Sequence, residues 1–386
     1  MLLSRDRILT THVGSLPRDA ALTDLLLRRE AGETVDADQV KGAVEAGVRM
    51  VVEKQIRAGV DIGSDGEQPR VGFQTYLPRR MDGFGGDWKR PRAPDYKQFP
   101  AFAAMMARRF PARPGGGKFP EAVAELTYRD EGDLDAEIAL FKDTAKIGVG
   151  GFAEGFMTAP SPGIIATTMR NAYYESYERY LFAIARELQY EFRAIVESGL
   201  MLQLDAPDLA MERSMMFQDE TEASFLMTCE LHIEALNRAL EGLPRDRVRL
   251  HCCWGNWEGP HMHDIALEPL LPIIYRARVG GLSIEFANPR HQHEYSALKR
   301  HKLPDEFVLL PGVIDTTSNF VEHPELVARR ILEAVDAVGD RERVIASTDC
   351  GFGTFAGYEH VASDVVWEKL LTCRQGADLA TRRLWG

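Results

Sequence analysis

The stretch Arg249–Asn256, RLHCCWGN, is typical of a buried β-strand that ends in metal ligands. Residues two apart on a strand point to the same side, so His251 and Cys253 share one face while Cys252 faces the other. Imidazole and thiolate are ligands that zinc prefers in proteins. The stretch therefore predicts half of a zinc site at one strand end.

Two other apolar runs supply candidates for the remaining ligands. Glu285 lies in GLSIEFANPR and Cys350 lies in RVIASTDCGFGT, and each closes its run as His251 and Cys253 do. His251, Cys253 or Cys350 alone would more often belong to the core, because cysteine is among the most buried residue types. Together at three strand ends they predict one zinc site, with the ligands His251, Cys253, Glu285 and Cys350.

The whole chain alternates between short apolar runs and long amphipathic segments. Such an order predicts an α/β protein, a (β/α)8 TIM barrel that occupies residues 1–386 as a single catalytic domain. An open doubly wound sheet is the alternative, but it would place polar residues at one switch point only. The expected strands are Ile8–Val13, Val60–Ser64, Phe152–Thr158, Leu200–Asp205, Val248–Cys253, Leu282–Ala287, Val308–Ile314 and Val344–Thr348. The expected helices cover residues 40–58, 134–147, 174–198, 220–240, part of 262–278, 295–300, 324–338 and 362–383.

Residues 68–129 interrupt this alternation. They contain FGGDWKRPRAPDY and RPGGGKFP, which are rich in glycine, proline, arginine and aromatic residues. We expect an insertion after the second strand, with a short hairpin or helix of its own, lying over one end of the barrel.

Composition restricts the class of protein. The chain has 386 residues, a hydrophobic fraction of 45% and a net charge of −12, which argues against nucleic acid or an anionic membrane as the partner. It contains neither an apolar run long enough to span a bilayer nor a signal peptide at its start. Five cysteines in a chain of this length do not make a disulfide scaffold, so a cytoplasmic location is expected.

The predicted ligand set favours one kind of chemistry. Zinc held by two thiolates, a carboxylate and a neutral imidazole has a net charge of about −1, which makes it a poor Lewis acid for hydrolysis. A free thiol has a pKa of about 8.5, and coordination to a metal deprotonates it. The expected reaction is therefore alkyl transfer to a substrate thiol, and Glu285 is the ligand expected to give way when that thiol arrives.

These residues resemble the C-terminal catalytic half of cobalamin-independent methionine synthase. The resemblance runs nearly end to end, through TTHVGSLP, AGVDIGSDGE, LQLDAPDLA, HCC, SIE, PGVIDTTS and TDCGFGT. It implies a TIM barrel that transfers a methyl group to homocysteine and gives methionine. It also implies that Glu67 and Asp205 bind the ammonium group of homocysteine, and that Val13 and Ser15 contribute to the same site. Two carboxylates favour a cationic substrate over a sulfonated thiol.

Three departures from the family concern the methyl donor. The N-terminal half of the full-length synthase has no counterpart in this sequence. The stretch MTAPSPGIIATTMRN lacks the tryptophan on which the family stacks folate, and Thr317 in GVIDTTSN stands where the family has a histidine. Asp315 in that segment remains a candidate catalytic residue that orients another group. We therefore expect a donor other than folate, such as a methyl-corrinoid on a corrinoid protein, a small methylated compound or an epoxide.

Two alternatives stay open. An epoxyalkane:coenzyme M transferase would need a cation near the thiol, for which Arg70 is the candidate. A non-catalytic zinc-binding or thiol-binding protein would bind the thiol without turnover.

After the fifth and sixth strands, Trp254 and Trp257 are expected either to line a pocket or to pack the loop. The histidines of these loops are expected to be solvated or to support the site, and they are His261, His263, His291 and His293.

Overall fold

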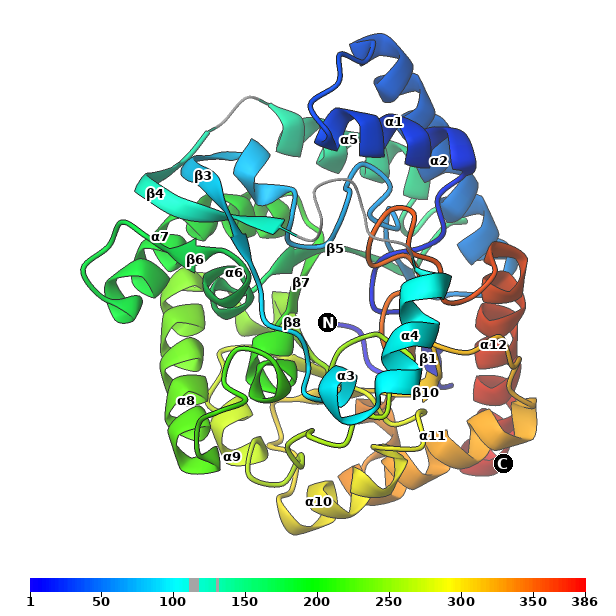
Figure 1. Ribbon diagram of the computed structural model, residues 1–386. Helices are drawn as coiled ribbons and strands as arrows, with labels where there is room; N and C mark the ends of the chain where they lie inside the picture. Colours follow the sequence, from blue (N-terminus) through cyan, green and yellow to red (C-terminus); the bar gives the residue numbers. More distant parts are fainter. Residues whose placement is uncertain (111–117, 130–131) are drawn as a thin grey trace.

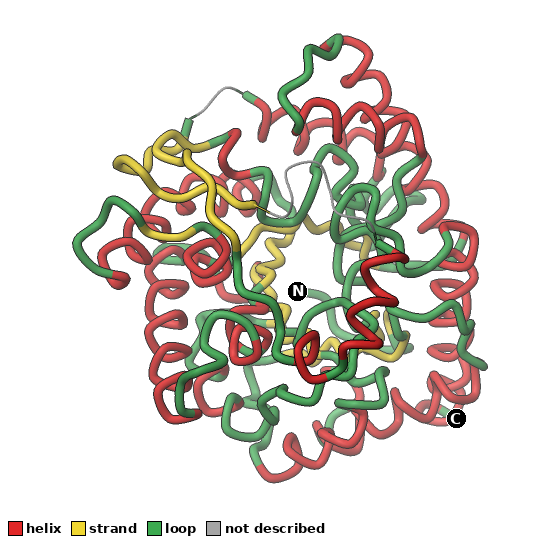
Figure 2. The backbone as a smooth tube through the Cα atoms, viewed as in Figure 1, coloured by secondary structure: helices red, strands yellow, loops and turns green. Residues whose placement is uncertain are grey.

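Eight parallel strands form a ring that is surrounded by helices (Figures 1 and 2). The computed structural model describes residues 1–110, 118–129 and 132–386. The strand order is β1-β11-β10-β9-β8-β7-β5-β2, and a parallel bridge between Thr11 and Ile62 closes the ring. This arrangement confirms the predicted TIM barrel. The strands are β1 (Leu9–Thr10), β2 (Ile62–Gly63), β5 (Glu154–Pro160), β7 (Met201–Asp205), β8 (Val248–Cys252), β9 (Gly281–Ile284), β10 (Val308–Ile314) and β11 (Ile345–Thr348).

Each strand falls within or beside a run that the sequence predicts as a strand. The first two strands are shorter than expected. The backbone N–H of Thr10 donates to the Asp61 carboxylate at 2.8 Å, so a side chain replaces part of the backbone ladder between β1 and β2.

The long helices form the outer layer, and side chains begin several of them. Asp36, Ser176 and Thr221 accept hydrogen bonds from backbone N–H groups in the first turns of α2, α7 and α8. The helices around the barrel are α1 (Ala20–Glu30), α2 (Ala37–Arg57), α5 (Asp133–Ala145), α6 (Pro162–Thr168), α7 (Tyr177–Glu197), α8 (Glu222–Ala239), α9 (Leu271–Ile274), α10 (Tyr295–Arg300), α11 (Pro324–Val338) and α12 (Ser363–Trp385). The sequence did not predict α1 or α6.

The segment 68–129 contains both a pair of strands and helices. β3 (Met81–Lys89) and β4 (Lys118–Tyr128) pair antiparallel, and β6 (Arg170–Asn171) pairs with β4 in parallel. α3 (Asp95–Gln98) and α4 (Pro100–Arg109) are drawn in front of the β1 and β10 side of the ring in Figure 1. Residues 111–117 of the expected insertion, and residues 130–131 just after it, lie outside the described residues. That these residues form an insertion within a single domain stays a prediction.

The described residues form three buried apolar clusters, a large one between the strands and the helices, one inside the barrel and a small one around Leu22 and Leu26 of α1. The inner cluster contains Phe156, Met201 and Leu310, and Met1, Leu2 and Leu3 pack against it. The N-terminal end of the barrel is therefore filled by apolar side chains, which leaves the C-terminal end for polar groups. Of the helices in the described parts of the chain, none is both long and apolar enough to cross a membrane.

Candidate metal centre

Three of the predicted ligands meet at the C-terminal end of the barrel. The ligand atoms of His251, Cys253 and Cys350 all lie within 4.8 Å of one another, and all three residues are buried. Nε2 of His251 is 3.5 Å from Sγ of Cys350. His251 belongs to β8, Cys253 follows it, and Cys350 follows β11, so two strands supply the cluster. Cys252 is fully buried in the core, as the strand alternation predicts.

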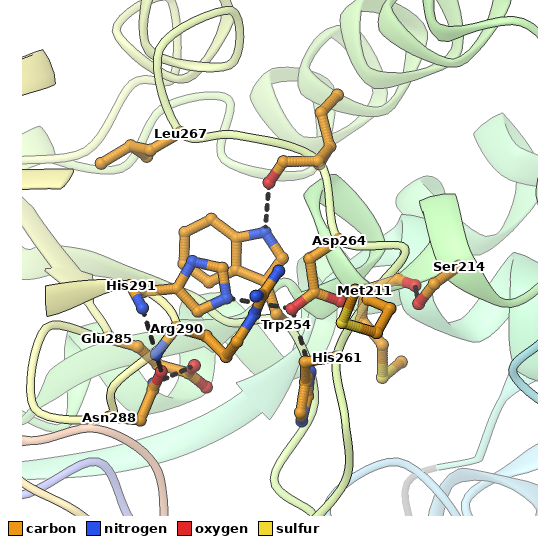
Figure 3. A network of polar contacts seen from close by, with 12 residues as sticks. Met211, Ser214, Trp254, His261, Asp264, Leu267, Glu285, Asn288, Arg290 and His291 are labelled. Atoms are coloured by element: carbon orange, nitrogen blue, oxygen red, sulfur yellow. Dashed lines mark hydrogen bonds and ion pairs between the residues drawn. The ribbon is translucent and has the colours of Figure 1, made fainter. Parts of the chain in front are cut away.

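Glu285, the fourth predicted ligand, joins the cluster from the end of β9. Its Oε1 accepts a hydrogen bond from the Cys350 thiol at 3.1 Å, while its Oε2 accepts one from Nδ2 of Asn288 at 3.0 Å. Figure 3 shows Asn288 beside the Glu285 carboxylate. One oxygen of Glu285 therefore faces the sulfurs, and the other is held by the following loop.

A buried carboxylate fixes that loop. Oδ1 of Asp349 accepts hydrogen bonds from the backbone N–H groups of Phe286 at 2.9 Å and Ala287 at 2.8 Å. Its Oδ2 accepts from the backbone of Asn288 at 2.9 Å and from its side chain at 3.2 Å. Asp349 thus ties the Glu285 strand end to the Cys350 strand end, which is how outer groups orient metal ligands.

The protein alone stabilises the negative charges of this cluster poorly. Burial, reinforced by the nearby Cys253 sulfur, raises the pKa of the Glu285 carboxyl well above its usual range. Burial and Cys253 likewise raise the pKa of the Cys350 thiol. The Cys350 thiol and the His251 ring lower the pKa of Cys253 well below its usual range. Only a cation among these groups would stabilise both sulfurs and the carboxylate in their charged forms.

The donor set fits zinc. Two sulfurs, one imidazole nitrogen and one carboxylate oxygen are ligands of the kinds that zinc takes in proteins. The sulfurs and the nitrogen lie within 4.8 Å of one another, and the Glu285 carboxylate reaches this group through its 3.1 Å contact with Cys350. Calcium and magnesium would prefer oxygen ligands instead. The geometry is therefore that of a candidate zinc centre.

The predicted thiol-binding residues line one cavity of about 350 Å³ together with three of the candidate ligands. They are Val13, Ser15, Glu67 and Asp205, next to His251, Cys253 and Cys350. A Cβ atom at Gly14 would lie 2.7 Å from Oε1 of Glu67, so only glycine lets the turn between Val13 and Ser15 come this close.

The two acids in this cavity, Glu67 and Asp205, are buried close to each other. Oε1 of Glu67 accepts from the Thr158 hydroxyl at 3.0 Å, while its buried Oε2 has no hydrogen-bond partner in the described chain. Burial raises the pKa of Glu67, although Arg70 and Arg18 oppose the rise. Burial also raises the pKa of Asp205 to about 7. A cationic group placed between the two carboxylates would lower both pKa values, which favours an ammonium substrate here.

Asp315 and Arg70 do not line this cavity. The Asp315 carboxylate accepts from the backbone N–H of Thr317 at 3.0 Å, from the Thr317 hydroxyl at 2.9 Å and from Ser318. It therefore faces its own loop and is not among the residues lining the cavity. Arg70 donates to the carbonyl of Thr158 at 2.7 Å and to Glu137 at 3.5 Å, and it does not line the cavity either.

The loop after β8 is fixed by a buried network (Figure 3). The His291 ring stacks on Trp254 with ring centroids 3.8 Å apart, and Trp254 donates to the carbonyl of Ile265 at 2.7 Å. The Asp264 carboxylate lies 2.9 Å from Nδ1 of His261 and 3.0 Å from Nε2 of His291. Trp254, His261 and His291 thus pack and support the loop, whereas Trp257 lines the cavity.

Several residues near the site were not identified from the sequence. Asn288 and Asp349 support the ligands through contacts between different strand ends, although each lies close in sequence to a predicted ligand. Gln74 and His360 line the cavity from residues 68–129 and from the loop after β11. The alternation of strands and helices gives no signal for such loop residues, because their positions depend on how the loops fold over the barrel.

Known proteins resemble this chain in sequence over almost all of its length. It is 26% identical over 383 residues to a methionine synthase of Thermococcus kodakarensis, covering 97% of this chain and 94% of the relative. It is 24% identical over 386 residues to a methionine synthase of Saccharolobus solfataricus, covering 97% and 95% of the two chains.

The fold also has close counterparts among solved structures. A B12-independent methionine synthase from a Shewanella species, in complex with selenomethionine, superposes with a TM-score of 0.74 at 19% identity, covering 98% of this chain and 99% of the other. A putative vitamin-B12 independent methionine synthase from Listeria monocytogenes gives a TM-score of 0.65 at 18% identity, covering 97% and 99%. The profile of the family described as "Cobalamin-independent synthase, Catalytic domain" matches residues 8–89 and 144–365. The chain belongs to this family of cobalamin-independent synthase catalytic domains.

Proposed function

We propose that this protein is a zinc-dependent methyltransferase that transfers a methyl group to the thiol of homocysteine and so produces methionine. The observation that carries the proposal is the convergence of His251, Cys253 and Cys350 within 4.8 Å, with Oε1 of Glu285 3.1 Å from Sγ of Cys350. Membership of the family and the names of the relatives support the same reaction.

The four candidate ligands would hold zinc. When bound, the metal would let a substrate thiol bind as a thiolate near neutral pH, which is the nucleophile that methyl transfer needs. We propose that Glu285 gives way when the substrate sulfur arrives, because it is the single oxygen ligand. Asn288 already donates to Oε2 of Glu285, so a displaced carboxylate keeps a hydrogen-bond partner.

Glu67 and Asp205 are proposed to bind the ammonium group of homocysteine, with Val13 and Ser15 forming the turn beside it. The unpartnered Oε2 of Glu67 and the raised pKa of the buried Asp205 support this assignment. A catalytic role for Asp315 stays a prediction, since its carboxylate faces its own loop.

The methyl donor is proposed to be something other than folate. A corrin macrocycle is larger than a cavity of about 350 Å³, so the cavity favours a small donor over a corrinoid carried by a partner protein. The protein is proposed to act as one catalytic domain with residues 68–129 inserted over the barrel end. The five cysteines form no disulfides, which supports a reducing compartment such as the cytoplasm.

The alternative epoxide reaction with coenzyme M receives less support. A sulfonated thiol needs a cation near its acidic end, and Arg70 already bonds Thr158 and Glu137 away from the cavity. Glu67 and Asp205 would repel a sulfonate.

Zinc-edge X-ray absorption on the zinc-loaded protein tests the proposal. We expect two sulfurs and two lighter ligands at rest, and a third sulfur when homocysteine is added but not when coenzyme M is added. Cys350→Ser should remove one sulfur, and the matched control Cys252→Ser should remove none, because Cys252 lies in the core. A third sulfur from coenzyme M alone would favour the epoxide reaction. No added sulfur from either thiol would contradict the thiol-activation mechanism, and binding without turnover for any donor would indicate a non-catalytic protein.

A further inference from the structure

The cavity is also lined by residues that belong neither to the candidate metal centre nor to the proposed thiol site, and we call this part of the cavity the outer half. This outer half is contributed by residues 68–129 and by the loops after β8 and β11. We define it by the lining residues that are decisive for its chemistry, which are Phe73, Gln74, Arg90, Trp257, Tyr358 and His360.

Among the residues that the structure describes, the outer half offers no free positive charge. Arg90 is the one lysine or arginine among the described residues that line the cavity, and its guanidinium forms an ion pair with the fully buried Glu212. Glu212 also accepts from the Thr167 hydroxyl at 3.0 Å and from the backbone of Met216 at 3.2 Å, so the pair is fixed in place. With Glu67 and Asp205 further in, the cavity disfavours an anion and favours a cation.

Aromatic rings give the outer half a second preference for cations. Trp257 lines the cavity and stacks on Tyr96 with centroids 5.4 Å apart and an interplanar angle of 11°. Tyr358 stacks on Phe110 with centroids 4.1 Å apart. Phe73 and Phe355, which also line the cavity, pack against each other at 6.0 Å. Aromatic rings attract cations that have lost their water, and methylated ammonium groups are bound by proteins in such sites.

Two buried polar side chains of the outer half have atoms without a hydrogen-bond partner in the described chain. Gln74 is 2% exposed and its Oε1 has no hydrogen-bond partner in the described chain, and the same holds for both ring nitrogens of His360, which is 6% exposed. Leaving such groups unsatisfied costs free energy, so a ligand is expected to satisfy them.

The surroundings of His360 keep its ring uncharged. Its ring packs edge-on against Phe110 and Tyr358, at 5.0 Å in each case. Burial, reinforced by Arg109, lowers the pKa of His360 to about 4, although Glu258 and Asp315 oppose the shift. The ring is therefore neutral at pH 7, and it offers a lone pair and an N–H group and adds no positive charge.

We propose that the outer half binds the methyl donor, and that this donor is a small methyl onium compound, either a sulfonium or a quaternary ammonium. This inference rests on the proposed function, because it places the donor beside the homocysteine sulfur. Trp257 and Tyr358 would face the cation, the Oε1 of Gln74 would face its positively charged methyl groups, and the N–H group of the neutral His360 ring would donate a hydrogen bond to its polar portion.

The reaction balances without a proton or a redox partner. The thiolate sulfur of homocysteine attacks the methyl carbon and forms a new carbon–sulfur bond. The bond between the methyl carbon and the onium atom breaks, and its electron pair stays on that atom. The negative charge of the thiolate and the positive charge of the onium cancel, so methionine and a neutral thioether or tertiary amine are formed. A neutral His360 suits this reaction, since the leaving group needs no acid.

Direct binding to the zinc-loaded protein tests the inference separately from turnover. Calorimetric titrations would use glycine betaine, dimethylsulfonioacetate and the uncharged-carbon isostere of betaine, 3,3-dimethylbutyrate. We expect at least one of the two onium compounds to bind about tenfold more tightly than the isostere. Comparing the affinities of glycine betaine and dimethylsulfonioacetate shows whether the site prefers an ammonium or a sulfonium. Equal affinities, or no binding of either onium while homocysteine still adds a sulfur to the metal, would overturn the inference and leave the proposed function standing. Failure of homocysteine itself to bind would instead contradict the proposed function.

Substitutions test whether the onium compound binds in the outer half of the cavity. Trp257→Leu should weaken onium binding about tenfold without changing homocysteine binding. Trp367→Leu is the matched control, because Trp367 lies on α12 and is not a lining residue of the cavity. Gln74→Leu and His360→Phe should also weaken the onium but leave the homocysteine affinity unchanged. When the wild type is incubated with homocysteine and an onium compound whose methyl group is labelled, the label should appear in methionine. Unchanged onium affinity in all three outer-half variants would contradict the assignment.

Discussion

At the residue scale, Asn288 links the chemistry of Glu285 to the loop that follows it. Asn288→Ala removes the hydrogen bond to Oε2 of Glu285. Substitution of a residue that orients a metal ligand typically lowers metal affinity 10- to 100-fold. We expect zinc affinity, measured by competition with a chromophoric chelator, to fall by roughly that factor. Asn171→Ala is a suitable control, because Asn171 holds a loop by hydrogen bonds to Tyr174 but lies outside the cavity lining. An equal loss of affinity in both variants would count against a specific role for Asn288.

His12 provides a prediction about pH at the same scale. It is buried, its Nε2 lies 2.8 Å from Oε1 of Gln55, and burial lowers its pKa to about 3. Above the unfolded pKa of about 6.5 both states are neutral, so the residue has no effect on the pH dependence of stability. As pH falls below about 6.5, the unfolded state gains a proton that the folded state refuses, and stability falls by up to ~1.4 kcal/mol per pH unit until the folded pKa is reached.

His12→Gln removes this titration. Urea denaturation of wild type and variant between pH 7 and pH 4 should give a shallower decline of unfolding free energy in the variant. Parallel pH dependences would mean that His12 is protonated in the folded state. Because glutamine keeps a polar group near Gln55, the comparison is made on the slope and not on the absolute stability.

At the scale of elements, the strand ends of β10 and β11 approach each other closely because residue 312 is glycine. A Cβ at Gly312 would lie 2.0 Å from Oδ1 of Asp349, the oxygen that accepts from Phe286 and Ala287. Gly312→Ala should therefore displace Asp349 and cost more than ~2 kcal/mol of unfolding free energy, together with part of the zinc affinity. Thermal denaturation and chelator competition would measure the two effects.

Gly42→Ala is the matched control for this substitution. Gly42 lies within α2, and a Cβ there would meet nothing within 4 Å. Alanine should stabilise the helix by about 0.5–1 kcal/mol. If both variants change stability in the same direction and by the same amount, the proposed crowding at Asp349 is wrong.

The elements also show which parts of the fold the sequence could predict. The strands could be predicted from the sequence because strands that are buried on both faces form continuous apolar runs. β10 and α11 have the bounds that the sequence predicts. α6 was not found because it has seven residues within a loop that contains prolines, although Ser161 accepts from the backbone of Ile164 at its start. Such a short helix depends on packing more than on its own propensity.

At the scale of the whole molecule, the predictable part of the site is the part that strands position. His251, Cys253 and Cys350 lie at the ends of apolar runs, so the barrel topology brings them within 4.8 Å of one another. Glu285, at the end of a third run, contacts Cys350 at 3.1 Å. Gln74 and His360 could not be predicted in this way, because the segment 68–129 and the loop after β11 have no repeating pattern. The contacts that place these loops are individual, such as the ion pair between Arg109 and Glu258.

The last prediction concerns the whole barrel, because the candidate ligands join strand ends that are far apart in the sequence. Metal bound only by the folded state stabilises it by RT ln(1 + [L]/Kd), which is about 4 kcal/mol when free zinc is 1,000 times Kd. For a domain of 386 residues, whose entropy of unfolding is about 0.8 kcal/mol/K, this corresponds to about 5 °C in Tm. Removing zinc with a chelator should therefore lower the Tm of the wild type by that amount, and the loss of protection in hydrogen exchange should be confined to the loops after β8, β9 and β11.

Cys350→Ser separates this effect from any general action of the chelator. The variant should already have the lower Tm and should not respond further, whereas Cys252→Ser should respond as the wild type does. The N-terminal end of the barrel should keep its protection, since Met1, Leu2 and Leu3 pack against the inner apolar cluster there and no candidate ligand lies at that end. An unchanged Tm in the wild type after complete zinc removal would mean that the folded state does not bind zinc more tightly than the unfolded chain does, which would contradict the proposed metal centre.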